Sequence, residues 1–464
     1  MRNFLPLSLS LILLGGCAVK EPPTVQETAA TAMGEEAEVP KTDFKAAANA
    51  AKGAVQDGWV RSFGDPKLEA LVSDAIDHNL DIRAAIARVD AAAAEATQAG
   101  AELKPAIVLG GSSKVADGFS SGSDSTDSSG VSLNASWELD VWGRIRAEAA
   151  AGTASFEATQ FELEAVYQSV AAQTAKAYFF LTEATLQVAE AQKAIDLYKR
   201  SLEVVEAKYE IGQVTKKEVS QAKARIAQGE IVIRRATSAK NQAARSLEIL
   251  LGRYPSAEIE GAEELVATPP PIPVGIPSEL LERRPDLQAA ERKVAAQFFE
   301  IQEAKAARLP SIALSAGAGS STSDLTDMIG LGSDYWTAGA NFLAPLYTGG
   351  ELEAQVEIET AQQQEALAEY GKLALKAFSE VEQGLSNESL LREQEDYIRE
   401  VLVESENALR VSNAQFEQGR IEFLFVLIQQ AEVIGARVSL LRIRDKRLQQ
   451  RIDLHLALGG NFEG

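Results

Sequence analysis

Cysteine and histidine are nearly absent from this chain, which limits the chemistry it can carry. Among 464 residues there are one Cys and two His. A single Cys excludes an internal disulfide framework, and His78 and His455 stand far apart without the spacing of a metal site. We therefore expect no cofactor and no metal, and we expect both histidines to lie on helix surfaces.

Basic residues are also scarce relative to acidic ones. Lys and Arg number 45 against 67 Asp and Glu, for a net charge of −22. A nucleic-acid partner needs a basic face, so none is expected. No loop of the form G-x-x-x-x-G-K-[ST] occurs, which argues against ATP hydrolysis. The carboxylates have the spacing of solvated helix faces, so we expect no catalytic residues and no enzyme activity.

Long hydrophobic runs are missing too. Beyond the first 17 residues, no apolar stretch reaches the ~18 residues of a transmembrane helix. If the chain spans a membrane, it must therefore do so as β-strands in a closed barrel. Aromatic residues make up only 6% of the chain while apolar residues make up 46%. With its abundant Ala, this composition favours long, closely packed helices.

The amino terminus has the features of a lipoprotein signal. Residues 1–16 contain a positive start, an apolar run and a final pair of glycines before Cys17. Small residues directly before a Cys resemble a lipobox, in which that Cys is lipidated and becomes the mature terminus. Ala18 occupies the place where an Asp marks inner-membrane lipoproteins, which indicates the outer membrane. We expect residues 17–65 to be a lipidated, irregular extension.

The rest of the chain is a duplication. The segment ending at Gly212 recurs 207 positions later, ending at Gly419, and Pro105 recurs as Pro310 at an offset of 205. The sequence therefore predicts repeat 1 over residues 66–252 and repeat 2 over residues 278–464. A Pro-rich linker, residues 253–277, separates them.

Both repeats predict the same order of elements. In repeat 1, Asp65 and Pro66 begin a helical segment that is interrupted near Asn79 and ends by Leu103. A strand pair follows, at about 106–141 in repeat 1 and 312–347 in repeat 2. A long helical hairpin completes each repeat, over 143–251 and 350–458. The outgoing helix is longer than its return partner, so the earlier helices are expected to pack along the remainder.

The strands have a membrane pattern. Residues 131–141 alternate strictly between apolar and polar, and a tilted transmembrane strand needs ~9–11 residues. One face is expected to meet lipid: Val131, Leu133, Ala135, Trp137 and Leu139. The other is expected to meet the lumen: Ser132, Asn134, Ser136 and Glu138. Four strands per chain fall short of the ~8 that a membrane barrel needs, so the chain must oligomerise.

Several motifs together resemble the outer-membrane factors, the TolC- and NodT-like exit ducts. They are residues 137–146, 281–287, 345–350 and 456–460, with the turn motifs at Gly212 and Gly419. The resemblance implies a mainly α fold with a membrane β-barrel. It further implies a homotrimer with a 12-stranded barrel and a 12-helix periplasmic tunnel. The lipobox is typical of the resistance-nodulation-division branch, whose partners are a periplasmic adaptor and a proton-driven inner-membrane pump.

The resemblance also places the functional ends of the hairpins. Two tips are expected to contact the adaptor: Gly212, Gln213, Val214, Thr215, Gly419, Arg420, Ile421 and Glu422. Gate candidates are Lys216, Lys217, Glu218 and Ile428. Many members carry an Asp after the second tip, and Ile428 is the matching residue here. Glu218 is interpreted equally as a gate charge or as the partner of Thr215 in a capping box.

The sequence leaves two alternative functions open. One is the exit duct of a type I protein secretion system, which the lipobox disfavours because such ducts generally lack it. The other is a coiled-coil structural lipoprotein without a pore, which the alternating strands disfavour. The favoured prediction is a passive outer-membrane duct for drugs or other small toxic compounds.

Overall fold

The computed structural model describes residues 19–34, 44–46, 53, 55, 57–116, 126–322 and 333–462. These form two compact units. Unit 1 takes the described parts of residues 1–34, 88–160 and 289–371, and unit 2 those of 35–87, 161–288 and 372–464. Each unit draws on both sequence repeats. The predicted signal peptide and Cys17 lie outside the described residues.

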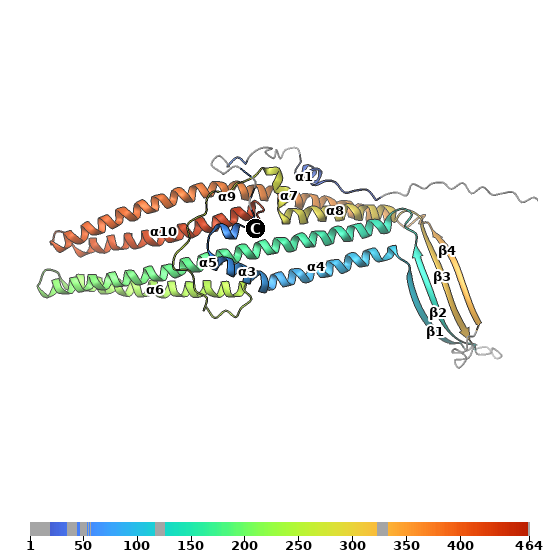
Figure 1. Cartoon of the computed structure of the whole chain (residues 1–464), viewed down its shortest axis with the longest axis horizontal. Coiled ribbons are helices and arrows are strands. Elements are labelled where there is room, and N and C mark those ends of the chain that lie inside the picture. The colour runs from blue at the N-terminus through green and yellow to red at the C-terminus, as the bar shows by residue number, and fades with distance from the viewer. Residues whose placement is uncertain are drawn as a thin grey trace, which may run out of the picture. The chain divides into compact units, whose positions relative to one another are not determined.

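Helices dominate the described part of the chain (Figure 1). They are α1 (Val25–Met33), α2 (Trp59–Ser62), α3 (Pro66–His78), α4 (Leu80–Ala99), α5 (Arg144–Glu210), α6 (Lys216–Leu250), α7 (Pro277–Arg283), α8 (Pro285–Ala306), α9 (Glu351–Glu417) and α10 (Phe423–Ala457), with a 3₁₀ turn at Gly100–Leu103. Adding 207 to the bounds of α5 and α6 gives the bounds of α9 and α10. The predicted duplication and its two long hairpins are therefore confirmed.

The predicted helix start and interruption are also confirmed. The Asp65 side chain accepts hydrogen bonds from the main-chain N–H groups of Lys67 and Leu68, and Pro66 is the first residue of α3. Asn79 lies between α3 and α4, with extended backbone. Its Oδ1 accepts from the N–H of Asp81 at 2.8 Å, so the side chain that ends one helix also caps the next.

Unit 1 contains one antiparallel sheet in the order β1-β2-β3-β4 (Figure 1). Its strands are β1 (Ala106–Ala116), β2 (Thr126–Glu138), β3 (Ser311–Thr322) and β4 (Ser333–Leu343). The strand pairs are confirmed, but β2 ends before the predicted residue 141. The carboxylate of Asp140 instead accepts from the N–H groups of Ile145 and Arg146, at 3.1 Å each, and so starts α5. Leu139 therefore follows the strand.

The expected irregular extension is wrong for residues 25–33, which form helix α1 in unit 1. Thr24 and Glu27 make a reciprocal capping box at its start, and Thr28 and Ala29 are buried. Before the helix, the main chain of Lys20 exchanges two hydrogen bonds with the side-chain amide of Gln302 on α8, at 2.8 and 3.2 Å. Burial and paired backbone groups thus hold this segment against unit 1.

Unit 2 has a hydrophobic core built on α2, α3, α5, α6 and α10. Its largest side chains include Trp59, Tyr178 and Phe179, each about 1% exposed. The prediction that His455 lies on a helix surface is wrong: it is 5% exposed, and its ring stacks on Trp59 at 5.9 Å. Burial, with the charge of Arg451, lowers the pKa of His455 to about 3, so it stays neutral. His78 is a surface residue, as predicted.

Helix α10 corrects the expectation that no segment after residue 17 has the length and apolar composition of a transmembrane helix. By length and composition alone, it is long and apolar enough to cross a membrane, with 28% of the relevant window buried. The same helix also buries Gln430, Asp445 and Arg451, and its apolar residues Phe423 and Val426 belong to a hydrophobic cluster of unit 2. Helix packing thus uses part of the apolar surface of α10, and other apolar residues, such as Phe425, stay exposed.

Candidate functional site

The sheet has two chemically different faces. In an antiparallel pair, residues directly opposite each other project to the same side. The register therefore assigns one face to Ile107, Leu109, Val131, Leu133, Ala135, Trp137, Ile312, Leu314, Ala316, Ala318, Trp336, Ala338, Ala340 and Phe342. These residues form an apolar band across the sheet, and towards the loop ends of the strands the same face turns polar, at Ser113, Ser129, Ser320 and Asp334. The alternation predicted for β2 is confirmed, and it extends over all four strands.

The opposite face is polar, and it is crowded. Asn134, Ser136 and Glu138 of β2 lie on it, beside small residues of β3. A Cβ atom added to Gly317 would lie 2.9 Å from Asn134 Oδ1, and one added to Gly319 would lie 2.7 Å from the main-chain oxygen of Val131. Glycine at these positions lets neighbouring strands and side chains approach closely, as happens where a sheet curves.

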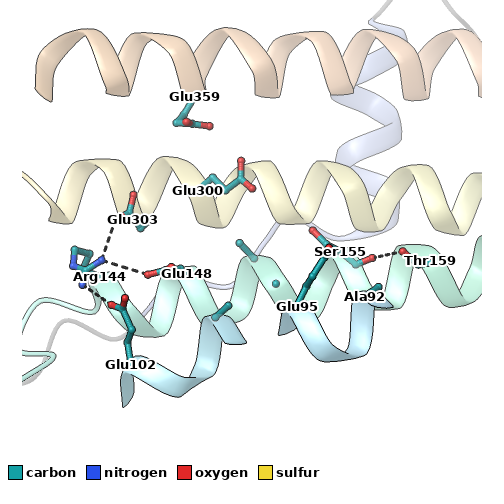
Figure 2. A pocket seen from close by; sticks show the side chains of 13 residues that line it. Ala92, Glu95, Glu102, Arg144, Glu148, Ser155, Thr159, Glu300, Glu303 and Glu359 are labelled. Carbon is teal, nitrogen blue, oxygen red and sulfur yellow. Dashed lines mark hydrogen bonds and ion pairs between the residues drawn. The ribbon is translucent and has the colours of Figure 1, made fainter. Parts of the chain in front are cut away.

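Arg144, the first residue of α5, is the hub of a charged cluster in unit 1 (Figure 2). We call Arg144 and its four carboxylate partners the collar. Its guanidinium lies within ion-pair distance of Glu102 at 3.0 Å, Glu138 at 3.4 Å, Glu148 at 3.3 Å and Glu303 at 3.5 Å. These partners come from the turn after α4, from β2, from α5 and from α8. One side chain thus joins the end of the sheet to three helical segments.

The electrostatics of the collar follow from its composition. Burial opposes the charge of Arg144, but hydrogen bonds to Glu102 and Glu138 raise its pKa above the usual value. Burial and the charge of Glu102 raise the pKa of Glu148. Further along, burial and the charge of Glu359 raise the pKa of Glu300. Carboxylates outnumber the single arginine here, and together they line a cavity of about 570 Å³ (Figure 2).

The hairpin tips lie in unit 2, and each turns at a glycine. Gly212 has φ of +75° and Gly419 has φ of +70°, a conformation that glycine adopts without strain. The N–H of Gln213 bonds to the oxygen of Lys208 at 2.8 Å, and that of Arg420 bonds to the oxygen of Gln415 at 2.9 Å. The two turns therefore have the same geometry, as the repeat predicts.

The two tips pack against each other. Their shared hydrophobic cluster buries Val205, Ala222, Phe416, Phe423, Val426 and Leu427, with Val214 and Ile421 partly buried at its edge. Around it, Lys217 Nζ lies 3.6 Å from the Glu422 carboxylate, with both side chains largely exposed. Arg225 donates to the oxygen of Leu427 at 3.3 Å. Apolar packing thus joins the hairpins, and polar bonds cross between them.

Glu218 has a local partner. Its carboxylate accepts from the N–H of Thr215 at 2.9 Å and from the hydroxyl at 2.5 Å, completing a capping box at the start of α6. The hydrogen bond from Thr215 lowers the pKa of Glu218. Ile428 is 44% exposed on α10, close to the exposed Leu424 and Phe425. The gate candidates therefore fall into three groups: Glu218 is a capping residue, Lys217 belongs to an exposed ion pair, and Ile428 belongs to an exposed apolar patch.

Comparison with known proteins matches this architecture. The family model described as "Outer membrane efflux protein" matches residues 71–253 and 276–460. The chain belongs to the outer membrane efflux protein family. It is 30% identical to the pyoverdine export outer membrane protein OpmQ of Pseudomonas aeruginosa, covering 100% of this chain and 98% of that protein. It is 28% identical to the cation efflux system protein CusC of Escherichia coli, covering 89% and 90%.

Solved structures agree with this membership. A crystal structure of CusC superposes with a TM-score of 0.84 at 25% identity, over 95% of this chain and 98% of that one. The outer membrane protein VceC of Vibrio cholerae superposes with a TM-score of 0.80 at 26% identity, over 88% and 100%. This efflux protein is accordingly a channel of the outer membrane, and its relatives are named for export and efflux rather than for catalysis.

Some features of the efflux protein escaped the sequence analysis. Carboxylates expected on solvated faces are in part buried, among them Glu183, Glu248, Glu395 and Asp445. Glu248 accepts from three successive N–H groups, those of residues 257–259, and so fixes the start of the linker. In the described residues, no group of three or more His, Cys, Asp or Glu side chains could hold a metal ion.

Proposed function

We propose that this protein is the passive exit duct of a tripartite efflux pump, which conducts drugs or other small toxic compounds out of the periplasm. Three copies would close a 12-stranded barrel above a 12-helix tunnel. A periplasmic adaptor and a proton-driven inner-membrane pump would complete the assembly and supply the energy. The observation that carries the proposal is the four-stranded sheet, one face of which carries an unbroken apolar band across all four strands.

The sheet edges support oligomerisation. The outer strands β1 and β4 each have one neighbour in the sheet, so among the described residues each leaves one edge unpaired. Unpaired edges are too costly in lipid, and four strands are too few to close on themselves. The order alternates in direction, so β4 of one copy would meet β1 of the next as another antiparallel pair. The apolar face would then meet lipid, and the crowded polar face would line the lumen.

The hairpin tips are proposed as the adaptor contact and the periplasmic gate. Gly212 to Thr215 and Gly419 to Glu422 form the two turns, which an adaptor would reach first. Lys217 and Glu422 form an exposed ion pair at this end, and such pairs contribute only ~0.2–1 kcal/mol each. A few weak bonds of this kind hold a closed state and still release it when an adaptor binds.

The amino terminus is proposed to carry a lipid. Residues 1–16 would be removed, and Cys17 would be lipidated at the start of the extension over residues 17–65. The barrel would already fix the protein in the outer membrane, so Cys17→Ala should abolish acylation while part of the transport function remains. Mass spectrometry of the mature protein measures this directly, and an unmodified Cys17 would contradict the proposal.

Planar-bilayer conductance tests the duct itself. The purified full-length protein should insert spontaneously and give discrete ion-conducting steps, and its migration on gels should depend on heating. A structural lipoprotein without a pore would give neither result. Deleting the gene in its host should raise sensitivity to small toxic compounds. If protein secretion were lost and sensitivity unchanged, the duct would belong to a type I secretion system instead.

A further inference from the structure

The Pro-rich linker is fixed in unit 2 by a buried arginine. Arg451 of α10 is 2% exposed, and its Nη1 donates to the main-chain oxygen of Pro269 at 2.9 Å and also to that of Pro270. Its Nη2 pairs with Glu388 on α9. Proline has no N–H, so this extended segment cannot pair as a regular sheet strand, and here its carbonyl oxygens accept from a side chain instead.

The hydrogen-bonding capacity of Arg451 is only partly used. Its Nε has no hydrogen-bond acceptor among the described residues. Burial lowers the pKa of Arg451 to about 10, because removal from water disfavours the charged form. Two of its partners are neutral carbonyl groups. Its one acidic partner is Glu388, so any positive excess in this region comes from other arginines.

A second group of arginines adjoins the first. The carboxylate of Glu395 on α9, only 3% exposed, pairs with Arg399, Arg444 and Arg447. Three cations around one carboxylate leave a positive excess. The Nε of Arg447 also has no acceptor within the part of the chain that the structure describes. Arg447 is four residues before Arg451 on α10, so the two lie on the same side of the helix.

These residues border a cavity of about 490 Å³ in unit 2, which we call the arginine pocket. Its lining includes Arg392, Arg447 and Arg451 against the single acid Glu388, with Pro270 and Leu390 as apolar wall. Arg392 is exposed on α9, and among the described residues it makes no ion pair or hydrogen bond. Within the described residues its guanidinium therefore stabilises no other side chain, and it is available to bind a ligand.

We propose that the arginine pocket binds an oxyanion, a carboxylate or a phosphate group, held by Arg392 and Arg447 with Arg451 behind them. Guanidinium groups bind both kinds of oxyanion through two parallel N–H bonds, and the pocket volume is within the range of small-molecule sites. The apolar wall accommodates a short hydrocarbon body attached to the anion. This binding site is separate from the conduction of cargo through the duct.

Calorimetric titration of the purified full-length protein in detergent tests the site. The probes are inorganic phosphate, succinate and hexyl phosphate, at ionic strength held constant with sodium chloride so that general screening does not change. The diagnostic variant is Arg392→Gln, because this side chain has no partner to lose. The matched control is Arg410→Gln, an exposed arginine further along the same helix and outside the pocket.

We expect saturable binding of at least one probe, weakened about tenfold by Arg392→Gln and unchanged by Arg410→Gln, since a charged hydrogen bond has about that effect. Binding of phosphate alone or succinate alone would identify the oxyanion, and tighter binding of hexyl phosphate would support the apolar wall. Absence of saturable heat with every probe would overturn the site. So would equal weakening in both variants, or none in Arg392→Gln. Bilayer conductance should be the same in all three proteins, which separates this result from the proposed duct.

Discussion

The ammonium group of Lys208 on α5 lies 5.1 Å from the ring centre of Phe416 on α9, 208 positions later in the chain. The same ammonium donates to the main-chain oxygens of Phe416 at 3.3 Å and of Glu417 at 3.1 Å. One side chain thus bonds the first hairpin to the turn of the second, beside the hydrophobic cluster that the two tips share. This contact makes the tips a single packed end rather than two independent turns.

Lys208→Met should loosen that end. Methionine keeps most of the apolar stem but loses the charge, so the cation–π contact, worth ~0.5–1 kcal/mol at an exposed site, and both hydrogen bonds disappear. We expect faster amide hydrogen exchange over residues 205–215 and 412–422 and more frequent channel openings. Lys199→Met, on the same helix outside the cluster, should change neither. Wild-type exchange in Lys208→Met would contradict the joining role.

Glu218→Gln should leave single-channel conductance nearly unchanged. The Glu218 carboxylate is engaged by Thr215 in the capping box, and Gln serves the same box. Glu422→Gln breaks the exposed pair with Lys217 and should raise conductance at low salt, with the increase shrinking as salt screens the charges. Ile428→Ser tests the alternative that the exposed apolar patch around Ile428 closes the pore. If Glu218→Gln were the variant that opens the pore, the capping role would not be its main one.

Leu133→Arg should impair assembly, whereas Asn134→Arg should be tolerated. Leu133 lies on the apolar face opposite Leu109 and Ala318, and an arginine facing mid-bilayer lipid costs ~2–4 kcal/mol. Asn134 lies on the polar face, where a long charged side chain extends into water. Folding into heat-modifiable oligomer, measured by gel shift after outer-membrane extraction, compares them. The reverse ranking would mean that the apolar face is not the lipid face.

Arg144→Ala should destabilise unit 1 more than its partial exposure indicates. Removing the hub leaves Glu102, Glu138, Glu148 and Glu303 facing one another without a cation, and charged hydrogen bonds contribute ~1.5–3 kcal/mol. Arg144→Lys restores the charge without the planar fork, so it should recover part of the loss. Melting temperatures measured at pH 5 and pH 8 check this. The deficit should be larger at pH 8, because burial and the charge of Glu102 raise the pKa of Glu148, which is therefore ionised more fully at pH 8 than at pH 5.

Asp445→Asn should remove a pH dependence of stability. Burial and the charge of Glu183 raise the pKa of Asp445 to about 7, and its Oδ1 has no hydrogen-bond partner among the described residues. A raised carboxyl pKa favours the folded state below the unfolded value near 4 and loses that contribution as pH rises to about 7. Wild-type stability should therefore fall from pH 4 to 7, by at most ~1.4 kcal/mol per pH unit.

The amide in Asp445→Asn keeps the bond with Gln449 and cannot ionise, so its thermal stability should vary less across that range. Asp396→Asn, an exposed change on α9, is the matched control and should follow the wild type. Equal slopes for wild type and Asp445→Asn would show that Asp445 is already ionised in the folded protein.

The regular elements were predictable because their signals are local. Alternation in residues 131–138, the glycine turns at 212 and 419 and the caps at Asp65 and Thr215 each depend on neighbours a few residues apart. The 207-residue offset then located the second repeat. The capping box of Thr24 and Glu27 is an equally local signal for helix α1, but the acidic, Pro-containing composition around it favours irregular structure.

Burial of polar residues could not be predicted in this way. His455 stacks on Trp59, and the charge of Glu183 raises the pKa of Asp445. In each pair the two residues are hundreds of positions apart. Periodicity reports which residues share a helix face, but not which other helix covers that face. The collar has the same origin, because Arg144 gathers carboxylates from segments that meet only in the fold.

The unequal outer strands have a genetic consequence. Each copy would contribute one β1 edge and one β4 edge to its neighbours, so the proposed ring closes head to tail and every junction is needed. A copy that folds but carries a damaged β4 edge would still occupy a place through its intact β1 edge. In a cell that makes both versions, one faulty copy would disable the sound copies bound to it, so such an allele would behave as dominant.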